Sequence, residues 1–290
     1  MTTLVIIGNG FDIQNGLPTS YRDFYKKYSP QLDEYLEYFP NFCDDQEWSY
    51  FEENLSEFDE DSFRENSAWQ PSMDDMIESS KYVNGYNDEI DEKVNELVDS
   101  IHNSFNAWLR SIDVNKASKF MEFPQRIKFI NFNYTSTLQE VYSIPDEDVL
   151  HIHGKVRRNV IFGHGLGDGN KASSMPSDEN EPWFEEASQS LSSVTDKLHK
   201  PVSEILENNR ATLESYGDLI KVIVIGHSIN DIDIPYFKSI LESYPNTLWE
   251  NWNYDEGVID SHSKLLSLGV DEDKLNSSCS SQLGVTYPLP

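Results

Sequence analysis

The apolar positions of the chain form short continuous runs, separated by long stretches in which apolar residues recur with a helical period. Branched apolar residues fill positions 4–7, and an even more apolar run covers positions 221–226. Continuous runs of this length that end at glycine are typical of parallel strands buried on both faces. Further strands are expected over residues 126–132, 149–154, 159–165 and 246–254, the last of them at an edge.

The segments between these runs indicate helices. Residues 29–123 lack any β-branched run, and residues 87–112 carry apolar side chains on one helical face. Further helices are expected over residues 183–216 and 255–268. A helix should also start near Thr19, capped by Thr19 or Ser20. Its aromatic stripe at helical spacing suits packing against a core or stacking on a nucleobase about equally: Tyr21, Phe24, Tyr25 and Tyr28.

Strands that alternate with helices predict an α/β fold. We expect a Rossmann-like, mostly parallel sheet with helices on both faces and a large helical insertion after the first strand–helix unit. The predicted organisation is a nucleotide-binding core (1–28 and 124–268), a helical insertion (29–123), a lid loop with a second helical segment (166–216) and a polar, poorly ordered tail (269–290).

Charge narrows the possible partners. The net charge is −29, from 51 acidic and 22 basic residues. Nucleic acids and anionic membranes are bound through Lys and Arg, so neither is expected as a partner. Two cysteines form no CxxC pair, and no run resembles a signal peptide or a membrane span. The expected location is the cytoplasm.

Polar residues gather where the predicted strands end. Asn9 and Asp12 follow the first strand, Asn133 and His153 follow two later ones, and residues 227–233 follow the most apolar strand. Ligands of parallel sheets bind outside the carboxyl ends of the strands, so this shared position favours one binding site.

Each of these features also has a structural interpretation. The turn Gly8-Asn9-Gly10 permits close approach of a phosphate, but it lacks the GxGxxG pattern and a following lysine. His153 suits a general base, although a single histidine at a strand end is more often structural. Asn133 suits a ribose or water ligand as well as a turn residue or helix cap.

A metal site is not expected. His151, His153 and His164 lie close in sequence, but no carboxylate signature such as HExxH accompanies them. The turn after the most apolar strand contains Asp231 and Asp233, which would suit a metal or a triad. Its simpler interpretation is that Ser228 and Asp231 hold a ligand hydroxyl or cap the next helix.

An acidic pair, Glu52-Glu53, lies beside an aromatic cluster. A solvated helix face is favoured over a catalytic role for this pair.

Several motifs together resemble the AbiH family of bacterial phage abortive-infection proteins. They are Gly8-Asn9-Gly10-Phe11-Asp12 with residues 16–24, Asn131-Phe132-Asn133-Tyr134-Thr135 with residues 136–138, His151-Ile152-His153-Gly154 and Ile225-Gly226-His227-Ser228 with residues 229–233. The motifs span most of the chain but leave the helical insertions uncovered.

The AbiH pattern is in turn similar to the sirtuin-like NAD-binding fold. That resemblance implies that Gly8 and Gly10 approach the phosphates, and that Asn133 holds the nicotinamide ribose and the attacking water. His153 would be the catalytic histidine. The remaining expected binding residues are Asn9, Phe11, Thr19, Tyr134, Gly226, His227, Ser228 and Asp231.

Two residues depart from the sirtuin pattern, Asn9 and Asp12. Asp12 is the candidate carboxylate for stabilising positive charge on the ribose. The four-cysteine zinc module of sirtuin deacylases is absent from the sequence, which argues against protein deacylation. The roles of Asn9, Asp12 and His164 stay open.

The implied activity is hydrolysis of NAD to nicotinamide and ADP-ribose, which would arrest infected cells. A non-catalytic NAD or nucleotide sensor acting through a partner protein is the alternative, and a metal-dependent nuclease or nucleotidase is a weaker one. The expected partners are NAD, a phage-derived trigger and further copies of the chain. Closure of the pocket by the loop 166–182 or by the helical insertion would restrain the resting enzyme.

Overall fold

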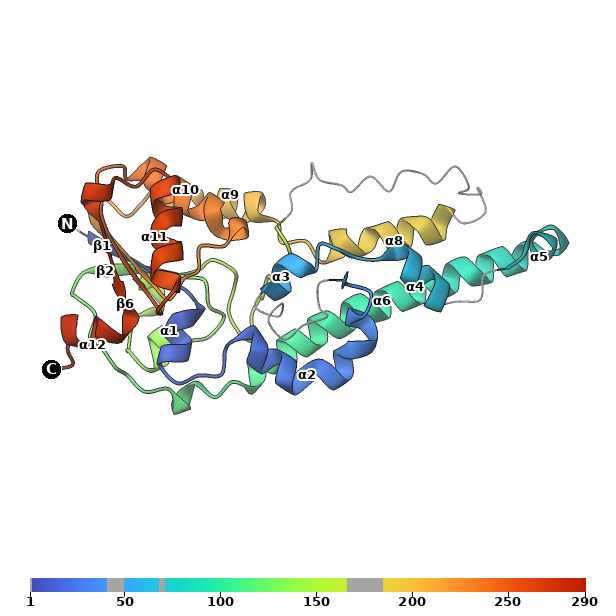
Figure 1. Cartoon of the computed structure of the whole chain (residues 1–290), viewed down its shortest axis with the longest axis horizontal. Coiled ribbons are helices and arrows are strands. Elements are labelled where there is room, and N and C mark those ends of the chain that lie inside the picture. The colour runs from blue at the N-terminus through green and yellow to red at the C-terminus, as the bar shows by residue number, and fades with distance from the viewer. Residues whose placement is uncertain (1, 41–49, 68–70, 166–184) are drawn as a thin grey trace. The chain divides into compact units, whose positions relative to one another are not determined.

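A computed structural model describes residues 2–40, 50–67, 71–165 and 185–290. The chain forms two compact units, which are described separately (Figure 1). The sheet unit contains Met1–Ser20, Leu109–Ile161 and Pro201–Pro290, and the helical unit contains Tyr21–Trp108 and Phe162–Lys200. The expected lid loop at residues 166–182 lies outside the described residues.

The sheet unit is built on six parallel strands in the order β3-β2-β1-β4-β5-β6. The strands are β1 (Thr2–Ile7), β2 (Ile127–Asn131), β3 (Val149–His151), β4 (Leu219–Ile225), β5 (Leu248–Asn253) and β6 (Leu275–Cys279). This arrangement confirms the predicted Rossmann-like α/β fold.

Both faces of this sheet are covered by helices (Figure 1). Alternate residues of β1 point to opposite faces, so Leu4 and Ile6 join one apolar core and Val5 and Ile7 join the other. The first core is completed by residues of α9 (Val202–Leu213), α10 (Ile234–Ser243) and α11 (Gly257–Ser267). The second is completed by residues of α1 (Asn9–Gln14), α7 (Thr137–Glu140) and α12 (Leu283–Thr286).

Short 3-10 turns connect several of these elements. They are η3 (Val114–Lys116), η4 (Asp146–Asp148), η6 (Asp231–Asp233), η7 (Glu272–Lys274) and η8 (Ser280–Gln282).

The described residues of the helical unit confirm the expected helical insertion after the first strand–helix segment. Its helices are α2 (Tyr21–Leu36), α3 (Phe51–Asn54), α4 (Glu60–Ser67), α5 (Met73–Glu78), α6 (Ser80–Ser111) and α8 (Glu185–Lys197). The amphipathic pattern predicted for residues 87–112 lies in α6 up to its end at Ser111 and makes up most of this helix, and its apolar face is buried. No helix of the described ranges has an apolar stretch sufficient to cross a lipid bilayer.

An aromatic cluster forms the centre of the helical unit. Phe24 of α2 is fully buried and contacts Phe51, Phe105 and Trp108, with ring centroids 5.1 to 5.6 Å apart. Core packing therefore accounts for Phe24, the buried member of the aromatic stripe.

Three sequence predictions are corrected by the structure. Residues 159–165 form no strand; His164 makes only an isolated bridge with His199. β5 is not an edge strand, because the expected polar tail supplies β6 along its outer side. From residue 185 on, the stretch 183–216 that was expected to be helical contains two helices, α8 and α9, with Pro201 immediately before α9. Proline favours such a boundary because it donates no backbone hydrogen bond.

Candidate functional site

The carboxyl ends of the strands meet at one edge of the sheet, here called the carboxyl edge. β2 and β3 lie on one side of β1, whereas β4, β5 and β6 lie on the other. The strand order therefore reverses between β1 and β4. In open parallel sheets, this reversal opens the crevice in which ligands bind.

Glycines of the turns after β1 and β4 pack directly against each other. The Gly8 amide donates to the Ile225 carbonyl at 2.9 Å, and the Gly10 amide donates to the Gly226 carbonyl at 2.8 Å. A Cβ on Gly8 would lie 2.5 Å from the Gly226 oxygen, so no larger residue fits there. Both amides that were expected to face a phosphate are therefore already engaged, and a phosphate would have to displace these contacts.

Asn9 holds the segment that leads from α1 to α2. Its side-chain amide donates to the Thr19 carbonyl at 2.8 Å, and Thr19 is buried. Asn9 therefore has a structural role at the carboxyl edge of the sheet.

The side chain of Phe11 lies in the core. Its ring contacts Phe120, Phe123 and Tyr142 at centroid distances of 5.3 to 5.9 Å, and the residue is fully buried. These contacts place the Phe11 side chain in the apolar core that α1 forms with the sheet.

Asp12 is a buried carboxylate beside the turn after β2. Thr135 Oγ1 donates to its Oδ2 at 2.5 Å, whereas Oδ1 has no hydrogen-bond partner within the described chain. Burial raises the pKa of Asp12 to about 6, although the hydrogen bond from Thr135 opposes the shift. A carboxyl group that titrates near neutrality can exchange protons under physiological conditions.

Asn133 joins the turn after β2 to the glycine turn. Its side-chain amide donates to the Gly8 carbonyl at 3.1 Å, and its backbone amide donates to Asn131 Oδ1 at 2.9 Å. The neighbouring Tyr134 hydroxyl donates to the Ile161 carbonyl at 3.1 Å. These bonds hold Asn133, the residue expected to bind a ribose, against the turn after β1.

His151 has both ring nitrogens engaged. Nδ1 donates to the Asn133 carbonyl at 3.2 Å, so Nε2 can accept from Gln139 at 3.0 Å. Burial lowers the pKa of His151 to about 4, which keeps the imidazole neutral. His151 therefore supports the loop that carries Asn133.

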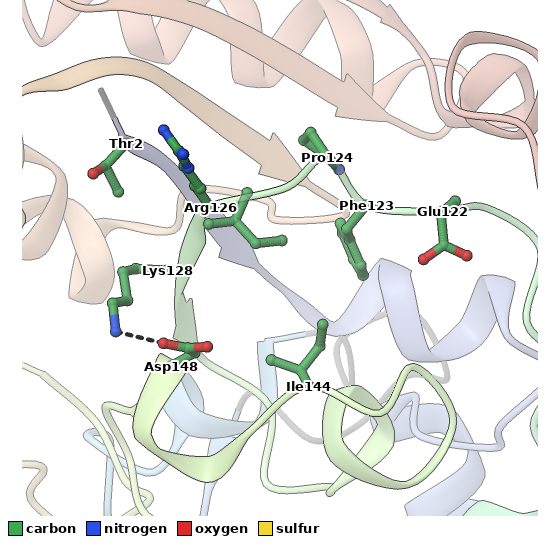
Figure 2. A pocket seen from close by; sticks show the side chains of 9 residues that line it. Thr2, Glu122, Phe123, Pro124, Arg126, Lys128, Ile144 and Asp148 are labelled. Atoms are coloured by element: carbon green, nitrogen blue, oxygen red, sulfur yellow. Dashed lines mark hydrogen bonds and ion pairs between the residues drawn. The ribbon is translucent and has the colours of Figure 1, made fainter.

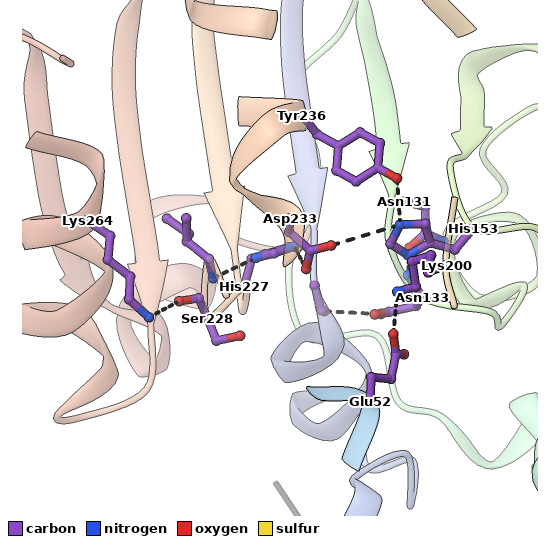
Figure 3. A network of polar contacts seen from close by, with 12 residues as sticks. Glu52, Asn131, Asn133, His153, Lys200, His227, Ser228, Asp233, Tyr236 and Lys264 are labelled. Atoms are coloured by element: carbon purple, nitrogen blue, oxygen red, sulfur yellow. Dashed lines mark hydrogen bonds and ion pairs between the residues drawn. The ribbon is translucent and has the colours of Figure 1, made fainter. Parts of the chain in front are cut away.

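His153 and His227 lie together at the carboxyl edge, beside Asp233 and Tyr236 (Figure 3). His153 Nε2 is 3.3 Å from the Tyr236 hydroxyl and 3.9 Å from Asp233 Oδ1. His227 Nε2 is 3.5 Å from Asp233 Oδ2. Both histidines are buried. This cluster combines two imidazoles, a carboxylate and a phenol, the groups that carry out proton transfer in enzymes.

Two members of this cluster were missed as site residues by sequence analysis. Asp233 was considered only for a metal or a triad, although its position after a strand could have indicated it. Nothing in the sequence pattern indicates Tyr236, which lies in α10. Two expected binding residues, Ser228 and Asp231, are exposed in the same turn, and the Ser228 carbonyl accepts from Lys264 at 3.2 Å.

Two other candidate residues, Glu52 and His164, lie in the helical unit. Glu52 is buried in an ion pair with Lys200, and it also accepts a hydrogen bond from the Tyr21 hydroxyl. The expectation of a solvated face is therefore wrong for Glu52. His164 Nε2 donates to the Thr195 carbonyl at 2.8 Å, which indicates a structural role for His164.

Within the described parts of the chain, no group of three or more His, Cys, Asp or Glu side chains could hold a metal ion. The histidines expected to be nearest to such a site, His151, His153 and His164, make the separate contacts given above.

A cavity of about 570 Å³ lies at the opposite edge of the sheet. Thr2 and Ile127, at the starts of β1 and β2, line it together with the ion pair of Lys128 and Asp148 (Figure 2). Because the strands are parallel, this cavity is separated from the polar cluster by the length of the sheet.

Comparison with known proteins agrees with the family motifs in the sequence. The family model described as Bacteriophage abortive infection AbiH matches residues 4–251, which span both units of the chain. No curated protein and no solved structure matches the chain. The similarity to sirtuin-like domains therefore stays a prediction. With most of its length matched, the chain belongs to the AbiH family of bacteriophage abortive-infection proteins.

Proposed function

We propose that the chain binds NAD at the carboxyl edge of its sheet and hydrolyses it to nicotinamide and ADP-ribose during phage infection. Family membership implies a role in abortive infection. The observation that carries the finer proposal is the strand order, with its reversal between β1 and β4 and buried polar side chains at that point. Dinucleotides bind at this position in sheets of the same order.

The proposed reaction uses water as the nucleophile. Water attacks the ribose carbon bonded to nicotinamide, and the C–N bond breaks with its electron pair passing to the pyridinium nitrogen. Nicotinamide thus leaves as a neutral molecule. The water proton is taken by His153 and then released to solvent, so one proton is produced for each NAD consumed.

The side chains near the first turn have distinct tasks in this proposal. Asn133 orients a ribose hydroxyl and the attacking water, because its own position is held by the Gly8 and Asn131 contacts. Asp12, when ionised, stabilises the positive charge that builds on the ribose in an oxocarbenium-like transition state.

The proposal is tested with purified full-length chain and NAD, with nicotinamide measured by chromatography. Wild type and the control His262→Gln, on α11, should release nicotinamide, whereas His153→Gln and Asn133→Ala should lose at least about 100-fold in rate. Binding of NAD without turnover would favour the sensor alternative. Addition of a chelator tests the metal-dependent alternative in the same assay.

A parallel experiment measures NAD in infected cells that express the chain. Loss of NAD should accompany growth arrest with wild type and be absent with His153→Gln. If the chain aborts infection while cellular NAD stays constant, the proposal is wrong.

A further inference from the structure

The Asp233 carboxylate lies between two buried imidazoles. Its Oδ2 is 3.5 Å from His227 Nε2, and its Oδ1 is 3.9 Å from His153 Nε2 (Figure 3). The Asp233 side chain is 14% exposed, and each histidine side chain is 4% exposed. Charges interact more strongly in such surroundings than at a hydrated surface, so one carboxylate can influence both rings.

The backbone determines which nitrogen of His227 carries the hydrogen. The Ile229 amide donates to His227 Nδ1 at 2.9 Å, so Nδ1 is an acceptor and the hydrogen of the neutral ring lies on Nε2. Nε2 is the nitrogen that faces Asp233. The donating residue itself has a φ of +54° and is fully buried, an unfavourable conformation for a β-branched residue. Strain of this kind is concentrated at functional sites.

The Phe132 ring contacts both His153 and His227, the two imidazoles that lie near Asp233. The Phe132 ring is edge-on to both imidazoles, with centroids 5.2 Å from His153 and 4.4 Å from His227. Tyr236 of α10 faces His153 Nε2 at 3.3 Å. Within the sheet unit, these contacts bring two titratable groups, Asp233 and Tyr236, to His153, and they bring Asp233 to His227 as well.

We propose that Asp233 is a positioning residue that holds the His153 and His227 imidazoles at Nε2 and so couples the two rings. When His153 takes the proton from water, the Asp233 carboxylate, 3.9 Å from its Nε2, stabilises the resulting imidazolium. The proton later passes to solvent. The reaction assigned to His153 rests on the proposed function, whereas the coupling of the two imidazoles does not.

The coupling is tested by NMR titration of the histidine rings in the full chain. The signals are assigned with His153→Gln and His227→Gln. Removal of the negative charge in Asp233→Asn should lower the pKa of both His153 and His227 by about one unit. The control Glu242→Gln makes the same change at an exposed site on α10 and should shift neither. A shift of only one ring, or of neither, would overturn the proposal.

A second variant keeps this test decisive if Asp233→Asn does not fold. His227→Gln removes the other imidazole that competes for the carboxylate, so the pKa of His153 should rise. An unchanged titration of His153 in His227→Gln contradicts the coupling.

Activity separates this proposal from the proposed function. The rate of an enzyme that uses a histidine base falls at low pH with the pKa of that base. In Asp233→Asn the acidic limb of kcat should therefore move about one unit lower, kcat at neutral pH should fall about 10-fold or more, and KM should change little. If wild type does not cleave NAD, the proposed function fails and the NMR result stands. If wild type is active and the acidic limb of the pH profile of kcat does not move in Asp233→Asn, the positioning role is wrong.

Discussion

At the scale of single residues, the buried carboxylate of Asp12 lowers the free energy of unfolding at neutral pH. Burial raises the pKa of Asp12 from 3.8 to about 6, so the native state binds this proton more tightly than the unfolded state does. The stability contributed by the protonated group is fully present below pH 3.8. It is lost as the pH rises through about 6. Because ionisation of this buried group does not stabilise the fold, its presence is better explained by a functional site, where such perturbed pKa values are concentrated.

Asp12→Asn should therefore stabilise the protein at neutral pH. The amide keeps an oxygen that accepts from Thr135, and it removes the ionisation, so the gain in unfolding free energy should grow between pH 4 and 7 to about 1–3 kcal/mol. Urea unfolding measured across this pH range tests it.

The matched control is Asp273→Asn, at an exposed position in η7. It should change the unfolding free energy by less than about 0.5 kcal/mol at every pH. A gain for Asp12→Asn that does not depend on pH would contradict the titration of this carboxylate.

At the scale of elements, the contact of two turns organises the carboxyl edge. Gly226 has a φ of +62°, and a Cβ there would lie 2.4 Å from the Phe11 nitrogen. The sequence pattern indicates a turn at each glycine, but the close approach of the two turns exists only in the folded sheet. Close packing of backbone against backbone requires glycine on both sides.

Gly226→Ala should destabilise the chain by more than its conformation alone explains. The control Gly217→Ala has nearly the same φ, +66°, with no atom within 4 Å of the added Cβ. The control should cost about 1–2 kcal/mol, from the left-handed conformation. Gly226→Ala should cost at least about 2 kcal/mol more, because backbone must move. Equal losses in chemical denaturation would show that the turns are not in tight contact.

The last element of the sheet comes from the segment that was predicted to be a polar tail. β6 pairs with β5, and Leu283 of α12 is fully buried in the core that contains Val5 and Ile7. The Tyr287 hydroxyl donates to Glu250 at 2.6 Å. These contacts make the tail part of the folded sheet unit.

Leu283→Ala should therefore lower the unfolding free energy by about 2–4 kcal/mol, as expected for a cavity in a core. Val285→Ala, two residues away and 83% exposed, should change it by less than about 0.5 kcal/mol. Urea denaturation compares the two variants directly. Similar small effects of both would mean that the tail does not support the core.

At the scale of the whole molecule, the net charge of −29 acts on the stability of the folded state. Like charges on a compact chain repel one another. Added salt screens this repulsion between charges that lie farther apart than about 10 Å at 0.1 M. Raising NaCl from about 20 mM to about 200 mM should therefore raise Tm by a few degrees. KCl at equal ionic strength should have the same effect, and a fall in Tm with both salts would contradict a dominant role of self-repulsion.

The sequence by itself determined the fold class and the helical nature of the insertion. Continuous apolar runs such as residues 4–7 suit a strand buried on both faces, and the period of residues 87–112 suits a long helix. Both signals are local, because they depend on which neighbouring side chains must avoid water. The sequence motifs also carried the family assignment, which the match over residues 4–251 shows.

Only the tertiary structure decided which groups meet. The place of β6 in the sheet, the pairing of Glu52 with Lys200 and the position of Asp233 between His153 and His227 join residues far apart in the chain. Local patterns do not encode such contacts, because they depend on strand order and on the packing of side chains from several elements. For the same reason, periodicity could not distinguish the exposed Ser228 and Asp231 from the buried His227 within one turn.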